Sequence, residues 1–111
     1  MEVKAIAKDT GISPRKVRPL VDMVRGKRVE EALSLLKFSP TPTARVVAKV
    51  VQSAAANAEN NFQIDPADLK IIKIFANEAR SMRRYRPRSR GRVSPIRKHS
   101  SHITVIVTEE G

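Results

Sequence analysis

The fold is decided by residues 69–108, LKIIKIFANEARSMRRYRPRSRGRVSPIRKHSSHITVIVT. Both ends of this stretch, 69–76 and 102–108, are rich in β-branched residues, which is typical of strands. Between them, residues 80–98 carry nine arginine and lysine side chains and no acid. Because consecutive strands commonly pair as neighbours, the sequence predicts an extended basic β-hairpin arm over residues 79–102.

A turn at Arg90-Gly91 sets the predicted register of this hairpin. It would place Phe75 opposite Ile106, and Ala79 opposite Ser101 or one of its two neighbours. At about 3.3 Å per residue, the arm would reach roughly 36 Å from its base to its tip, well beyond a domain of this size.

The rest of the chain predicts three helices and one more strand. Ser13-Pro14 is typical of a helix start, with Ser13 as the cap, and that helix would end at Gly26. Apolar residues at helical spacing predict helices over 29–38 and 41–60, and a weak alternation over 2–8 predicts a strand beside the C-terminal one. We therefore expect an α+β fold: three helices packed on a small antiparallel sheet, with a long protruding β-hairpin.

Length and composition narrow the class of protein. A chain of 111 residues, 41% of them hydrophobic, has room for one core, so residues 1–111 are expected to form a single domain. The absence of cysteine excludes a disulfide framework and a thiolate zinc site. No run approaches the roughly 20 apolar residues of a membrane span. The formal net charge of +11 favours nucleic acid as the partner, with an anionic membrane as the weaker alternative.

The residues that could perform chemistry form no recognisable site. His99 and His102 would point to opposite faces of a strand, and Ser100 and Ser101 have no orienting acid beside them. The other candidates are isolated carboxylates: Asp65, Asp68 and Glu78. With only four glycines, the chain has no phosphate-binding loop. We expect no enzymatic activity, no metal site and no cofactor.

Two sets of basic side chains are expected to contact phosphates. The first lies on and after the first predicted helix, where six bases accompany one acid although a solvated face usually mixes both signs. Its members are Arg15, Lys16, Arg18, Arg25, Lys27 and Arg28. The second set lies in the arm: Arg80, Arg83, Arg84, Arg86, Arg88, Arg90, Arg92, Arg97 and Lys98. Tyr85 lies among these residues and would either stack on a base or pack across the hairpin.

Three blocks of sequence carry a family resemblance. They are SPRKVRPLVDMVRGK at 13–27, AKVVQSAAANAENN at 48–61, and the arm with its second strand at 81–107. In this order they resemble the bacterial-type large-subunit ribosomal protein L-twenty-two family over nearly the whole chain. The resemblance implies a small α+β domain on the outer surface of the large subunit, with a hairpin that threads between RNA domains to line the nascent-peptide exit tunnel.

The resemblance also implies partners, a location and a role. The partners would be large-subunit ribosomal RNA, neighbouring ribosomal proteins and the nascent peptide, with no membrane and no homo-oligomer. The location would be the cytoplasm, in the ribosome, with an organellar ribosome as the alternative. The role would be structural, bridging several RNA domains during assembly. The tunnel-lining tip would consist of Arg88, Ser89, Arg90, Gly91 and Arg92.

Two positions in the arm depart from the family pattern. Ala79-Arg80 stands where many relatives have Gly-Pro, and Ser89 stands where alanine is usual. The first lies at the hairpin base and the second adds a hydroxyl near the tip. Neither changes the assignment.

The residues alone leave other classes of protein open. An architectural DNA-binding protein could insert a basic β-arm into the minor groove, and would form a dimer that binds duplex DNA as tightly as RNA. A membrane-active basic peptide is disfavoured, because no predicted helix has an aromatic apolar face. An RNA-modifying enzyme is a formal alternative that no residue supports.

Overall fold

The computed structural model describes residues 2–8, 10–79 and 100–109, together with the backbone of 82–87 and 93–98 in the arm. The elements are, in chain order, β1 (Glu2–Ala7), α1 (Pro14–Val24), α2 (Val29–Lys37), α3 (Pro42–Phe62), the 3-10 turn η1 (Pro66–Asp68), β2 (Leu69–Glu78), β3 (Met82–Pro87), β4 (Val93–Lys98) and β5 (Ser101–Glu109). This order of strands and helices confirms the expected α+β fold.

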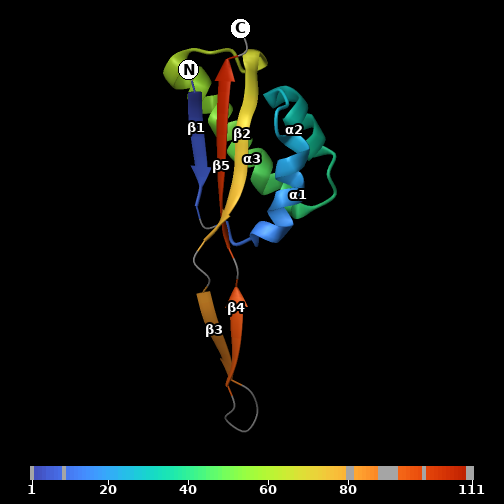
Figure 1. Ribbon diagram of the computed structural model, residues 1–111, viewed down its shortest axis with the longest axis vertical. Helices are drawn as coiled ribbons and strands as arrows, with labels where there is room; N and C mark the ends of the chain where they lie inside the picture. The colour runs from blue at the N-terminus through green and yellow to red at the C-terminus, as the bar shows by residue number, and fades with distance from the viewer. Residues whose placement is uncertain (1, 9, 80–81, 88–92, 99, 110–111) are drawn as a thin grey trace.

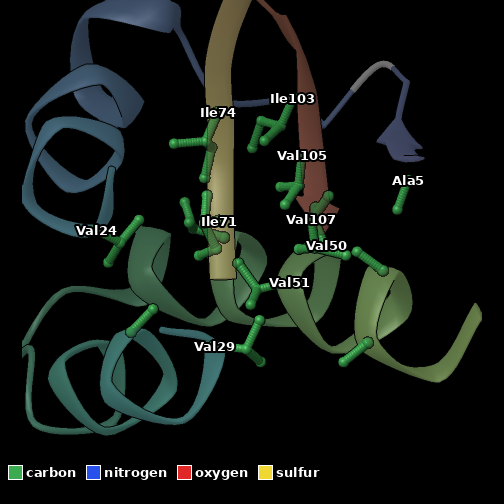
Figure 2. Close-up of a cluster of buried hydrophobic side chains, with 14 of the residues drawn as sticks. Ala5, Val24, Val29, Val50, Val51, Ile71, Ile74, Ile103, Val105 and Val107 are labelled. Carbon is green, nitrogen blue, oxygen red and sulfur yellow. The ribbon is translucent and has the colours of Figure 1, made fainter. Parts of the chain in front are cut away.

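The core lies between a three-stranded antiparallel sheet and the helices. The strand order is β1-β5-β2, and the helices pack on one face of the sheet (Figure 1). Because side chains alternate along a strand, Ile103, Val105 and Val107 of β5 all point to the helices, and all three are fully buried. Figure 2 shows Ile71 of β2 and Val51 of α3 in the same cluster.

The helices form where the apolar spacing predicts them. The buried residues of α1 are Pro14, Val17, Val21 and Val24. The predicted cap at Ser13 is wrong in one respect: its side chain makes no capping hydrogen bond, and its carbonyl oxygen accepts from the amides of Lys16 and Val17 instead. Helix α3 continues to Phe62, slightly past the expected end, and stops at Gln63, whose φ is 54°.

The arm continues from the end of the sheet at which β2 ends and β5 begins (Figure 1). Strands β3 and β4 form a separate antiparallel pair, and the molecule measures 65 × 27 × 18 Å. The protruding hairpin of the expected fold is therefore present. The turn predicted at Arg90-Gly91 lies outside the described residues.

The predicted register of the hairpin is wrong. Phe75 pairs with Thr104 rather than with Ile106. In the arm, Pro87 pairs with Val93, one position away from Ser94, its partner in the predicted register. Between β2 and β5 the shift is two positions, which keeps every side chain on its original face, so the apolar pattern of these two strands fits both registers. Hydrophobic burial alone therefore cannot distinguish these two registers of β2 and β5.

Candidate nucleic-acid interface

The first turns of α1 present three basic side chains to solvent. Arg15, Lys16 and Arg18 are exposed, because the apolar face of α1 is buried on the opposite side. A surface groove is lined by Ser13, Pro14, Arg15, Lys16, Arg18 and Glu78. Within the described part of the chain, none of the three basic side chains forms an ion pair. Their charges are therefore available to a phosphate.

This basic groove lies at the base of the arm. Glu78 is the last residue of β2 and pairs with Ser101, the first residue of β5, and these two strands lead into the hairpin. One residue further, the amide of Ala79 donates to the carbonyl of Ser100 at 3.0 Å, within the range of the predicted pairing. An anionic chain entering along the arm would meet the groove at its base.

Two serines attach the loop before α1 to the base of the arm. The hydroxyl of Ser101, which is fully buried, donates to the Ile12 carbonyl at 2.7 Å and lies 2.9 Å from the Thr10 hydroxyl. The hydroxyl of Ser100 accepts from the Gly11 amide at 2.9 Å. These serines, which the sequence offered only as weak catalytic candidates, have a structural role: they hold the loop that precedes the basic helix against β5.

The opposite end of α1 is attached to the edge of β2. Arg25 pairs with Asp22 at 2.7 Å and donates to the Ile74 carbonyl at 3.0 Å. The amide of Ile71 donates to the Lys27 carbonyl at 2.9 Å. Arg28 forms a backbone bridge with Lys70, and Lys27 lies 3.6 Å from Glu31. The six basic residues predicted on and after the first helix therefore form two groups. Arg15, Lys16 and Arg18 lie at the base of the arm, whereas Arg25, Lys27 and Arg28 lie along the edge of β2.

Basic residues occupy directly opposite positions in the arm. Arg83, Arg84, Tyr85 and Arg86 lie on β3, and Arg97 and Lys98 lie on β4. In this register Arg83 pairs with Arg97, and Tyr85 pairs with Pro95. Like charges at directly opposite positions destabilise an isolated ribbon. The other predicted contacts lie outside the described residues: Arg80, Arg88, Ser89, Arg90, Gly91 and Arg92.

The remaining sequence candidates are not brought together. Among the described residues, no three histidine, cysteine or acidic side chains gather as metal ligands; His102 lies on β5, and His99 is outside the described residues. Asp65 caps η1 by accepting from the Ala67 amide at 3.0 Å, and Asp68 lies in the same turn. In the described chain, no helix combines the length and the apolar character that crossing a bilayer requires.

Known proteins match this chain along almost its entire length. The family described as Ribosomal protein L22p/L17e matches residues 5–108. Three relatives, each called Large ribosomal subunit protein uL22, come from the strains 195, BAV1 and CBDB1 of Dehalococcoides mccartyi. Each is 67% identical over 109 residues, which cover 98% of this chain and 100% of the relative.

The fold, the basic arm and these matches define a structural ribosomal protein rather than an enzyme. The chain belongs to the ribosomal protein L22p/L17e family of the large subunit, in its bacterial type, which confirms the resemblance. Its location is accordingly the cytoplasmic ribosome, among ribosomal RNA and other ribosomal proteins.

Proposed function

We propose that the chain binds large-subunit ribosomal RNA through two adjoining surfaces, the arm (79–102) and the basic groove at the start of α1. The arm would bridge several RNA segments during assembly, and the groove would hold RNA at its base. Residues 80–98 carry nine basic side chains without an acid. In a ribosome the phosphates of RNA are the abundant anions, and they attract a segment with this density of positive charge.

The pairing of Arg83 with Arg97 is the observation that carries this proposal. The Cα atoms of antiparallel partners lie about 4.5–5.5 Å apart, and a pair of like-charged groups, such as two guanidinium groups, at these positions destabilises a ribbon. A phosphate beside both groups replaces that repulsion with two attractions. The arm is therefore expected to gain order and stability when RNA surrounds it.

The basic groove supports the same partner independently of the arm. Arg15, Lys16 and Arg18 have no ion-pair partner among the described residues, and the serine hydrogen bonds hold the preceding loop at the arm base. This attachment fixes where the helix begins relative to the start of β5, at the base of the arm. One RNA segment could therefore contact both surfaces.

We propose that the tip, Arg88 to Arg92, lines the exit tunnel and lies near the nascent peptide. The basis is the family membership together with the reach of the arm. A photo-crosslinking amino acid at Ser89, in ribosomes stalled with a labelled nascent chain, should capture that chain. The same amino acid at Phe38, on the domain, should not. Equal capture from both positions would refute the tip assignment.

The salt dependence of RNA binding tests the proposed function. With about six arm phosphate contacts, the logarithm of the binding constant of the full chain for deproteinised large-subunit RNA should fall with log salt at a slope of about −4 to −5. Changing Arg84, Arg88 and Arg92 to Ala should reduce the magnitude of that slope by about 2 to 3. The matched control removes three exposed charges from α2 and α3: Lys37, Arg45 and Lys49, each changed to Ala.

The control triple variant should keep the slope of the unaltered chain. If the arm variant also keeps it, the arm does not bind RNA, and the proposal is wrong. Equal affinity for duplex DNA, together with a dimer in sedimentation, would instead support the architectural DNA-binding alternative.

A further inference from the structure

In the described part of the chain, no helix covers the outer face of the sheet. All three helices lie on the other face (Figure 1), so the side chains that alternate with the core residues point away from them. Those side chains include Lys4 and Ile6 of β1, Thr104 and Ile106 of β5, and Lys73 and Phe75 of β2. We call these six residues the outer face.

The strand register arranges the outer face in two rows. One row is Ile6, Thr104 and Phe75, because Thr104 of the central strand pairs with both of the others. Ile6 is 46% exposed and Phe75 37%, whereas Thr104 between them is only 6% exposed. Two large apolar side chains therefore flank a small one, and an aromatic ring remains accessible from solvent.

The second row adds positive charge directly beside this apolar row. Ile106 pairs with Lys4 on one side and with Lys73 on the other, and both lysines are exposed. Neither lysine forms an ion pair among the described residues. A lysine thus lies at each edge of the face, two residues along the strand from Ile6 or Phe75.

We infer that the outer face is a second RNA-binding surface, on which one unpaired nucleotide stacks against Phe75 while Lys4 and Lys73 contact the flanking phosphates. This inference rests on the proposed function, since it assumes that RNA surrounds the domain. Stacking on an aromatic ring with cations beside it is the usual way in which proteins hold single-stranded nucleotides.

Size and position favour RNA over a protein partner. The outer strands of the sheet are about 10 Å apart, two strand spacings of about 4.8 Å, so the apolar row has the width of a base. Strands β2 and β5 also connect this face directly to the arm, so RNA that contacts the arm base can continue onto the sheet.

A matched pair of aromatic substitutions tests the stacking. Phe75→Leu keeps apolar bulk over Thr104 but removes the flat ring. Phe38→Leu is the control, because Phe38 is 80% exposed at the end of α2, beside Lys37 and Arg45. Loss of one stacked base should weaken binding of the full chain to deproteinised large-subunit RNA by about 5-fold to 150-fold in Phe75→Leu. Phe38→Leu should leave the affinity unchanged.

A matched pair of charge substitutions tests the phosphate contacts. Lys4→Gln with Lys73→Gln should reduce the magnitude of the salt slope by about 1.4 to 1.8, whereas Lys37→Gln with Arg45→Gln should not change it. Thermal unfolding of each variant shows whether the fold is retained.

As a second readout that needs no variant, ultraviolet crosslinking in intact large subunits should attach a nucleotide to the tryptic peptide of residues 74–80, which contains Phe75.

The outcomes separate this inference from the proposed function. If the outer-face variants keep the affinity and slope of the unaltered chain while the arm variant loses slope, the inference is wrong and the proposed function stands. If Phe38→Leu weakens binding more than Phe75→Leu, the stacking surface lies on the helical side instead. If neither the arm variant nor the outer-face variants change binding, both proposals fail.

Discussion

Removing the hydroxyl of Ser101 should destabilise the protein well beyond what a surface serine contributes. This side chain is fully buried, donates to the Ile12 carbonyl at 2.7 Å and lies 2.9 Å from the Thr10 hydroxyl. Ser101→Ala breaks both hydrogen bonds and leaves the Ile12 carbonyl with only a 3.5 Å contact to Thr10. At about 1 kcal/mol for each bond, with a further penalty for the carbonyl, we expect the free energy of unfolding to fall by about 2 to 3 kcal/mol.

Urea denaturation followed by circular dichroism measures this change. The midpoint should move to lower urea with the m-value unchanged, since the unfolded chain exposes the same surface. A loss of 2 kcal/mol should lower Tm by roughly 8 to 12 °C for a domain of about this size. The control is Ser100→Ala, which removes an exposed hydrogen bond to the Gly11 amide and should lower the free energy of unfolding by about 0.5 to 1 kcal/mol.

A double-mutant cycle with Thr10→Val identifies the cause of the loss. If Thr10 and Ser101 act as one network, the effect of the double variant should differ from the sum of the single effects by about 0.5 kcal/mol or more. The reasoning is refuted if Ser101→Ala costs no more than Ser100→Ala. That result would mean that the buried hydroxyl does not hold the loop before α1 in place.

Three further predictions follow from burial, backbone angles and charge. Ile103→Ala should lower the free energy of unfolding by about 2 to 5 kcal/mol, and Phe38→Ala by less than about 0.5 kcal/mol; similar values in urea denaturation would contradict the assigned core. Gly26→Ala should cost about 1 to 2 kcal/mol because φ is 78°, although an added methyl would meet nothing within 4 Å; Gly26→Asn should cost less, and equal losses would exclude the backbone explanation. Arg15→Gln with Arg18→Gln should reduce the RNA salt slope by about 1.4 to 1.8 without changing Tm, and an unchanged slope would remove the groove from the interface.

Some of the proposed interface was predictable from the sequence, because charge density needs no tertiary information. The nine basic residues of 80–98 lie close together in the sequence, so their positive charges stay close in space in any conformation of the chain. The helical spacing of Arg15 and Arg18 likewise predicts that both lie on the outer side of α1, since the opposite side is apolar.

Other parts of the proposed interface were not predictable, because they depend on contacts between distant residues. Ser101 lies 89 residues from Ile12, and no pattern in either segment indicates the hydrogen bond between them. Arg25 looked equivalent to Arg15, yet it donates to the Ile74 carbonyl, which is available only because α1 packs beside β2. Phe75 could be recognised as a strand residue, but its pairing with Thr104 could not be predicted, because pairing with Ile106 would leave the same side chains on each face of the sheet.

The sequence by itself determined the class of fold, the location of the helices and strands, the concentration of charge in one arm and the family. These properties follow from periodicity, composition and local order, which are encoded within short segments. Only the tertiary structure decided that the basic groove lies at the arm base, that two serines attach it there, and that Lys4, Phe75 and Lys73 share one open face. The physical reason is that register and packing bring together residues far apart in the chain, and several arrangements satisfy the same hydrophobic pattern.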